Sequence, residues 1–208
     1  MDVAALRTIS PCFEVLSSGT SANRRNSVVS ERFPMIRDAY PRHSDPFRYW
    51  LERRWDLRAP QFTYFLLNPS IARIDDGNDR TVPKLRKITE ANGGGGFELI
   101  NLFATVDTNQ IGLHLPTAVG DESKKWIEMV VDRSTKLILG WGDGNADDEN
   151  SRGRQAAVRA RAKAVWPVVR KHDLWCFAKN KSESPRQPSR PVVKDDCILI
   201  RYRPHLYP

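Results

Sequence analysis

The sequence has few of the residues that build disulfide frameworks or transition-metal sites. Its three cysteines, Cys12, Cys176 and Cys197, are odd in number and widely spaced, and its four histidines show no ligand spacing. Paired cysteines characterise small secreted scaffolds, and regularly spaced Cys or His residues characterise zinc sites. We therefore expect reduced cysteines, no metal and no cofactor.

Long apolar runs are also lacking. No segment approaches the roughly 20 apolar residues that a membrane helix needs. The N-terminal stretch MDVAALRTIS has an early Asp and no apolar core, unlike a secretory signal. Hydrophobic residues make up 40% of the chain and charged residues 28%, as in ordinary globular proteins. These features predict a cytoplasmic protein with no membrane partner, and they leave the oligomeric state open.

Acidic residues are outnumbered by basic ones. The chain has 25 Asp and Glu against 33 Lys and Arg, which gives a formal charge of +8. Such an excess favours anionic partners through long-range attraction. Because many basic proteins bind no nucleic acid, the charge makes nucleic acid or a nucleotide a candidate partner without establishing it.

Sustained periodicity begins only after the first 44 residues. Residues 1–44 include the polar stretch SSGTSANRRNSVVSER, which predicts an N-terminal arm or extension. Residues 45–208 are expected to form one α/β domain, in which 189–208 is a C-terminal extension with an edge strand. The expected strands are 62–67, 97–103, 136–140 and 174–178, with a fifth at 197–202, and the expected helices are 82–91, 122–133 and 154–171.

Alternating strands and helices are typical of a parallel sheet covered by helices on both faces. We therefore predict a three-layer α/β/α fold with a central, mostly parallel sheet of four strands. Such sheets bind ligands beyond the carboxyl ends of their strands. The residues at these ends are polar: Asn68-Pro69-Ser70, Asn101, Trp141-Gly142-Asp143 and Lys179-Asn180.

Each of these groups also has a structural interpretation. Asn-Pro-Ser favours turns, a buried Asn101 often satisfies loop backbone, and Trp141 is either a core residue or a stacking surface. The acidic residues at 75, 76 and 79 form a solvated loop or supply a carboxylate to the site. The basic residues near 152–171 form a solvated helix face or contact phosphates; they are Arg152, Arg154, Arg159, Arg161, Lys163, Arg170 and Lys171.

Between Phe47 and Pro188 the chain resembles the DUF1643 family, small bacterial and phage proteins of uncharacterised function. The resemblance lies in six blocks in the family's order: RYWLERRW, FLLNPSIA, the DRT of residues 79–81, INLFAT, GWG and LWCFAKNKSESPRQP. The family usually ends close to Pro-x-His-Pro-Leu-Tyr. In this chain Gln187 stands where the histidine would be, which puts histidine-dependent chemistry in doubt.

A more distant resemblance is to the uracil-DNA glycosylase superfamily, and it implies a uracil-DNA glycosylase-like fold. The first motif of that superfamily, Gly-Ile-Asn-Pro-Gly in one branch, is similar to residues 67–70. An Asn that ends an apolar strand is similar to Asn101, and a later Trp-Gly is similar to Trp141-Gly142. A His-Pro loop closes the site there, and Gln187-Pro188 falls at the corresponding place.

This second resemblance implies roles for individual residues. Asn68 would position a water, Asp79 would assist it, and Gln187 would donate to the leaving base. The expected ligand-binding residues are those that read or stack on a flipped base, hold a phosphate or complete the rim; they are Pro69, Ser70, Asn101, Phe103, Trp141, Gly142 and Asn180. Phosphate contacts are expected from Arg152, Arg154, Arg159 and Arg161.

The function expected from these features is recognition of a nucleobase in nucleic acid or a nucleotide, with possible hydrolysis of an N-glycosidic bond. The alternative is a non-catalytic binding module on the same fold, which the replaced histidine favours. A third interpretation is a hydrolase or transferase that acts on a free modified nucleoside or nucleotide. The basic helix and the Arg-rich N-terminal arm favour a polymer over a free base.

Overall fold

The computed structural model of the protein describes residues 35–43, 45–144, 150–188, 194 and 197–204. The strands of this part of the chain are β1 (Ile36–Tyr40), β2 (Trp50–Arg54), β3 (Gln61–Leu66), β4 (Gly96–Asn101), β5 (Leu137–Gly140), β6 (Leu174–Cys176) and β7 (Ile200–Arg201). The α-helices are α1 (Thr81–Ala91), α2 (Ser123–Asp132) and α3 (Ser151–Val169). Two short 3-10 helices, η1 (Ile111–His114) and η2 (Pro116–Val119), lie between β4 and α2.

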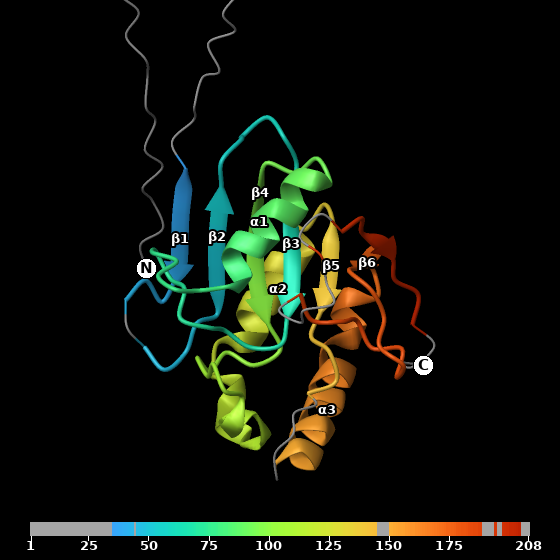
Figure 1. The fold of residues 1–208 in the computed structure, drawn as a ribbon. Helices are drawn as coiled ribbons and strands as arrows, with labels where there is room; N and C mark the ends of the chain where they lie inside the picture. The colour runs from blue at the N-terminus through green and yellow to red at the C-terminus, as the bar shows by residue number, and fades with distance from the viewer. Residues whose placement is uncertain (1–34, 44, 145–149, 189–193, 195–196, 205–208) are drawn as a thin grey trace, which may run out of the picture. The chain divides into compact units, whose positions relative to one another are not determined.

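The strands form one mixed sheet in the order β1-β2-β4-β3-β5-β6-β7 (Figure 1). Its centre, β4-β3-β5-β6, is parallel throughout and consists of the four strands predicted from apolar runs. Antiparallel strands extend this centre on both sides, with β2 and β1 beside β4 and with β7 beside β6. The sheet is therefore larger than the four-stranded sheet that the sequence predicted.

The sequence analysis missed β1 and β2 because their pattern is not apolar. In β2 the inward positions are Leu51 and Arg53, so a charged side chain interrupts the alternation. In β1 only Ala39 is buried, as is common for a strand at the edge of a sheet. Because β1 pairs with β2 over its whole length, residues 36–40 belong to the sheet although they lie within the range expected to form an arm.

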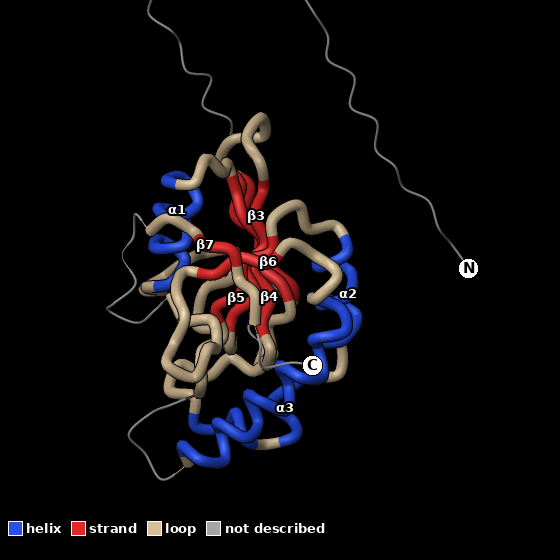
Figure 2. Tube along the Cα trace, turned by 90° about the vertical axis from the view of Figure 1, so that its right-hand side faces the viewer, coloured by secondary structure: helices blue, strands red, loops and turns tan. Residues whose placement is uncertain are grey.

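Helices cover both faces of the sheet, as predicted for a three-layer fold. On one face α1 packs through Val82, Leu85 and Ile88 in a cluster with Tyr64 and Leu99. On the other face α2 and α3 share a cluster in which Ile127, Val130, Val158, Ala162 and Val165 contact Phe65, Ile100 and Leu139. Figure 2 shows the strands between α1 on one side and α2 on the other, with α3 below them in this view.

Local sequence sets both ends of α1. The Asp79 carboxylate accepts hydrogen bonds from the backbone N–H groups of Thr81 (2.7 Å) and Val82 (2.8 Å), which caps the first turn. At the other end Gly93 adopts a left-handed φ of +79°, a conformation that favours glycine. The chain then turns directly into β4, so α1 ends at the run of Asn92 and the glycines 93–96.

Candidate functional site

The carboxyl ends of the parallel strands meet at one edge of the sheet, where a pocket of about 480 Å³ opens. Its apolar floor includes Leu66 and Leu67 at the end of β3 and Gly140 at the end of β5. Its polar lining comes from three loops and the start of α1, and includes Asn68, Ser70, Asn78, Arg80, Thr81, Asp107, Thr108, Gln110 and Gln187. Of the sequence-predicted residues, Asn68, Pro69, Ser70 and Gln187 come together here. We call this hollow the carboxyl-edge pocket.

Asn68 is held in one orientation by its own amide nitrogen. The Nδ2 group donates to the carbonyl oxygens of Asp107 (2.6 Å) and Pro69 (3.1 Å). Because both partners are carbonyls, the amide must present its N–H₂ to them and its Oδ1 away from them. Within the described residues no donor reaches this Oδ1, so it is an uncommitted acceptor at the pocket.

Gln187 reaches the pocket from the loop after β6. Its side chain packs on Gly142, where an added Cβ would lie 2.9 Å from the Gln187 Cγ. Gly142 itself has a φ of +70°, and its N–H donates to the Pro185 carbonyl (2.7 Å). Gln187 is only 7% exposed, and within the described part of the chain its amide makes no hydrogen bond. A largely buried, uncommitted amide is available to a ligand.

Buried arginines fasten the loop between β3 and α1, which carries one wall of the pocket. Arg53 donates through Nε (2.8 Å) and Nη2 (2.6 Å) to the Asp76 carboxylate, and also to the Arg73 carbonyl. Arg48 donates to the Ala72 carbonyl (2.5 Å). Burial lowers the pKa of Arg48 to about 10, and the charge of Asp79 acts in the opposite direction. The loop is thus tied to β2 and to the segment just before it.

The two carboxylates nearest the pocket both serve the backbone. Asp79 caps α1, as described above. Asp107 accepts from the N–H groups of Asn109 (3.0 Å) and Gly112 (2.8 Å), one on each oxygen. The predicted assisting role of Asp79 therefore competes with a capping role, and Asp107 offers no freer carboxylate.

The predicted base-contacting residues Asn101, Phe103 and Trp141 do not line the pocket. Phe103 and Trp141 are buried in the core cluster beneath α2 and α3, and Trp141 packs edge-on against Phe65 at 5.4 Å. Asn101 is 5% exposed, and neither of its amide atoms has a partner within the described residues. These positions make Phe103 and Trp141 core residues, the structural alternative that the sequence left open for Trp141.

Asn180 lies in a network that shapes the loop after β6. Its Nδ2 donates to Asp143 Oδ2 (2.8 Å), and its Oδ1 accepts from Arg186 Nε (3.1 Å). The hydroxyls of Ser182 and Ser184 both donate to Asp143 Oδ1. Asn180 thereby joins the loops after β5 and β6, and a second hollow of about 450 Å³ lies beside this network.

The four arginines predicted to contact phosphates differ in environment. Arg154 is fully buried and donates to the carbonyls of Gly144 (2.8 Å) and Gln110 (3.0 Å). Arg161 donates to the Leu102 carbonyl (3.0 Å), and burial lowers its pKa. Both hold loops to α3, and their guanidinium groups already donate to backbone carbonyls. Arg152 and Arg159 are exposed, and only Arg159 lines the second hollow.

The sequence analysis left Arg80 and Asp107 unassigned, and it grouped Lys163 with the other basic residues of α3 without singling it out. Arg80, exposed at the carboxyl-edge pocket, lies within the DRT block but was passed over for its neighbour Asp79. Lys163 lies one helical turn after Arg159, and only the three-dimensional structure separates it from the other basic residues of α3. Asp107 supplies a carbonyl to Asn68 from a loop without a motif, and nothing in the sequence signals it.

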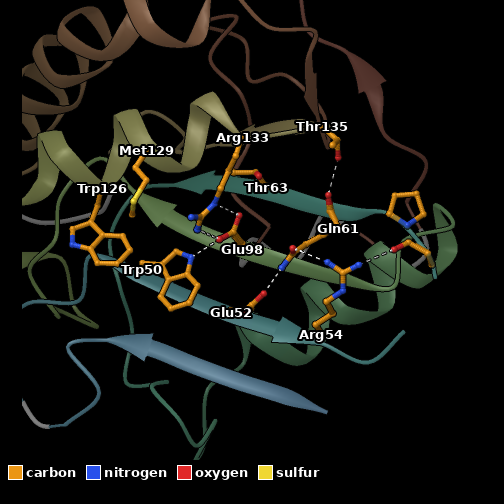
Figure 3. A pocket seen from close by; sticks show the side chains of 12 residues that line it. Trp50, Glu52, Arg54, Gln61, Thr63, Glu98, Trp126, Met129, Arg133 and Thr135 are labelled. Atoms are coloured by element: carbon orange, nitrogen blue, oxygen red, sulfur yellow. Dashed lines mark hydrogen bonds and ion pairs between the residues drawn. The ribbon is translucent and has the colours of Figure 1, made fainter. Parts of the chain in front are cut away.

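A larger hollow of about 860 Å³ lies on the α2 face of the sheet, beside the starts of β3 and β4; we call it the amino-end pocket (Figure 3). Glu98 accepts hydrogen bonds there from Trp50 Nε1 (2.7 Å) and from Arg133 Nε (3.1 Å). Gln61 donates to Glu52 (2.7 Å) and accepts from Arg54 (2.9 Å). Its carboxylates and the Gln61 amide are therefore paired, whereas the buried Arg54 Nε and Trp126 Nε1 have no hydrogen-bond partner within the described residues.

The described ranges contain neither a metal-ligating cluster nor a helix suited to span a membrane. No group of three or more His, Cys, Asp or Glu side chains gathers there in a way that could hold a metal ion. None of the helices of this part of the chain has both the length and the apolar character of a membrane span. Burial raises the pKa of the Cys176 thiol to about 11, which makes it a poor nucleophile. Cys12 lies outside the described residues.

The fold and the pocket define an α/β protein with a polar hollow at the carboxyl edge of a mixed sheet. Residues 48–189 match the family described as "Protein of unknown function (DUF1643)". This match covers more than half of the chain, so the protein belongs to that family, in agreement with the resemblance of its motifs. No curated protein and no solved structure matches the chain.

Proposed function

We propose that the carboxyl-edge pocket binds a nucleobase, as part of a nucleotide or of nucleic acid, on a uracil-DNA glycosylase-like fold. The observation that carries this proposal is the pair of uncommitted amide groups at the pocket. Within the described residues, neither the Oδ1 of Asn68 nor the amide of Gln187 has a hydrogen-bond partner. Both residues line the same hollow.

The chemistry of a nucleobase fits these groups. The edge of a base alternates hydrogen-bond donors with acceptors, and a glutamine amide offers one of each kind. The rings of a base need an apolar surface, which Leu66, Leu67 and Gly140 supply. The order of the motifs shared with the uracil-DNA glycosylase superfamily gives independent support, because its Asn-Pro and His-Pro elements correspond to Asn68 and Gln187.

Binding is better supported than cleavage. Hydrolysis of an N-glycosidic bond needs a group that activates water, and an amide cannot act as a general base at neutral pH. The carboxylates of Asp79 and Asp107 accept backbone hydrogen bonds instead. We therefore favour the alternative of a non-catalytic reader of nucleobases and treat base release as an arm of the test.

The test measures nucleoside binding at equilibrium with a panel of natural and deaminated nucleosides. We expect one or more to bind, and we expect Gln187→Ala to weaken binding by roughly tenfold, since each lost hydrogen bond contributes about 1 kcal/mol and an unpaired base edge costs more. The matched control is Gln61→Ala, which removes the same amide from the amino-end pocket and should leave the affinity unchanged.

Single-turnover base release from oligonucleotides that contain uracil or hypoxanthine is measured in parallel. Release by the wild-type protein and none by Asn68→Ala would make the protein a glycosylase with Asn68 in its site. Binding without release supports the proposed reader. If no nucleoside, nucleotide or oligonucleotide binds, the proposal is wrong.

A further inference from the structure

We propose that the second hollow, beside α3, binds the phosphate group of the nucleotide whose base occupies the carboxyl-edge pocket. This inference rests on the proposed function and deepens it, because it makes a phosphorylated nucleoside the preferred ligand. The hollow has a volume of about 450 Å³ and is lined by the loop after β5, the basic side of α3 and the serines of the loop after β6. We call it the α3 pocket.

Two uncommitted cations line the α3 pocket. Arg159 and Lys163 lie four residues apart on α3, so they project from the same side of the helix. Both are exposed, and within the described residues neither has an ion-pair or hydrogen-bond partner. Arg161, on the same helix, is instead committed to Leu102 and Ser123. The difference singles out Arg159 and Lys163 as groups available to an anion.

The charge balance of the α3 pocket favours an anion. Among the described residues that line the pocket, Asp143 is the one acidic side chain. Its carboxylate accepts hydrogen bonds from Asn180, Ser182 and Ser184, which stabilise its charge within the protein. The two cations of α3 exceed this single negative charge, and a phosphate would restore the balance.

A single residue contact joins the α3 pocket to the carboxyl-edge pocket. Gly142 lines the α3 pocket, and Gln187 lines the carboxyl-edge pocket. The two residues touch, since a Cβ on Gly142 would lie 2.9 Å from the Gln187 Cγ. In a nucleotide only the sugar separates the base from the phosphate. Adjoining pockets, one with amides and the other with cations, match that division of the ligand.

The start of α1 is the competing place for a phosphate. Helix N-termini bind anions through unpaired backbone N–H groups, and Arg80 lies there at the carboxyl-edge pocket. The N–H groups of Thr81 and Val82, however, already donate to Asp79. That end of the helix offers one cation, whereas the α3 pocket offers two.

The first experiment probes the α3 pocket without a base. Calorimetric binding of inorganic diphosphate is compared between the wild-type protein, the Arg159→Gln/Lys163→Gln double variant and two control variants. We expect binding by the wild-type protein and a loss of at least about tenfold in the double variant, since both charge-assisted contacts are removed. Arg152→Gln removes an exposed cation of α3 outside the pocket and should change nothing. A loss confined to Arg80→Gln would overturn the inference in favour of the start of α1.

The second experiment compares a nucleoside with its 5′-monophosphate. The inference predicts tighter binding of the monophosphate and, in the double variant, a loss of this advantage with unchanged nucleoside affinity. Equal affinities in the wild-type protein would overturn the phosphate site and leave the base pocket standing. Diphosphate binding that depends on Arg159 and Lys163, without any nucleoside or nucleotide binding, would instead overturn the proposed function and leave an anion site that does not serve a nucleotide.

A third arm identifies the source of the phosphate. A single-stranded oligonucleotide that binds more tightly than the monophosphate, with a steeper loss of affinity as salt rises, makes the phosphate part of a polymer. A monophosphate that binds at least as tightly, with a shallow salt dependence, makes it part of a free nucleotide. Either result agrees with the inference only if the double variant weakens binding.

Discussion

The two ends of the parallel strands carry hollows of opposite character. The amino-end pocket is the larger, about 860 Å³ against about 480 Å³ for the carboxyl-edge pocket. Its carboxylates and its Gln61 amide are paired within the protein, as Glu98 is with Trp50 and Arg133 (Figure 3), whereas the nitrogens Arg54 Nε and Trp126 Nε1 have no partner among the described residues. At the carboxyl edge, Gln187 has no such partner within the described residues. The two hollows therefore differ in the kind of group that is left uncommitted: nitrogen donors at the amino end, and side-chain amides that can also accept hydrogen bonds at the carboxyl edge.

The physical basis of this difference is the cost of removing polar groups from water. A buried donor or acceptor without a partner costs about 1–3 kcal/mol, so most are paired within the protein. The carboxylates and the Gln61 amide of the amino-end pocket follow this rule, and its Arg54 Nε and Trp126 Nε1 nitrogens depart from it. The carboxyl-edge pocket leaves the Asn68 Oδ1 and the Gln187 amide without a partner among the described residues, at the ends where parallel strands commonly place ligands.

The largest expected effect compares two adjacent arginines of β2 that serve the two regions. Arg53 is 1% exposed and fastens the loop that carries the pocket wall, whereas Arg54 bonds to Gln61 at the amino-end pocket. We expect Arg53→Met to lower the free energy of unfolding by about 3 kcal/mol, because it leaves Asp76 and the Arg73 carbonyl unpaired. Arg54→Met should cost less than about 1 kcal/mol. Both variants are measured by urea unfolding. A larger loss of unfolding free energy in Arg54→Met than in Arg53→Met would contradict this expectation.

The second effect concerns Glu98 in the amino-end pocket. Glu98→Gln keeps the shape of the side chain but opposes an N–H₂ group to Arg133 or Trp50, and we expect a loss of about 2 kcal/mol in unfolding free energy. Nucleobase affinity should not change, because this network serves stability. Urea unfolding and nucleoside binding are measured on the same sample. A loss of affinity in the folded variant would assign the ligand to the amino-end pocket instead.

The smallest effect concerns Gly142, which lies where the two proposed subsites adjoin. Gly142→Ala places a Cβ against Gln187 at a φ of +70°, so we expect a loss of about 1 kcal/mol in stability together with weaker binding. The control is Gly153→Ala within α3, whose Cβ would meet only the His114 Cβ at 3.6 Å. This control should raise stability by about 0.5 kcal/mol or more. Thermal unfolding and nucleotide binding are measured for both variants. Equal stability and equal affinity of the two would contradict the proposed contact between Gly142 and Gln187.

Much of the fold could be predicted because the parallel strands are buried on both faces. Strands such as β3 and β4 consist of nearly continuous apolar residues, so they stand out in the sequence. β2 could not be found in this way, because Arg53 points inward. Its partners, the Asp76 carboxylate and the Arg73 backbone carbonyl, lie in a loop that is distant in the sequence. A buried charge is recognisable only once its partners are known.

The candidate site was predictable where it follows strand ends and not where it depends on burial. Asn68 and Gln187 lie on loops after two predicted strands and do meet at one pocket. The arginines of α3 all carry the same positive charge, so the sequence does not distinguish Arg154, which is buried, from Arg159, which is exposed. Helical periodicity does not reveal whether the adjoining loops offer carbonyls to a guanidinium, as Gly144 and Gln110 do to Arg154.

The central claim is that the carboxyl-edge pocket, and not the larger amino-end pocket, receives the ligand. Its most direct test is a nuclear magnetic resonance titration of the ¹⁵N-labelled protein with the nucleoside 5′-monophosphates, because each pocket contains side-chain N–H groups that report on it. Binding at the carboxyl edge should shift the amide signals of Asn68 and Gln187, assigned through Asn68→Ala and Gln187→Ala, while the signals of Gln61 and the Trp50 indole stay unchanged. Shifts of Gln61 and Trp50 with unmoved Asn68 and Gln187 signals would contradict it.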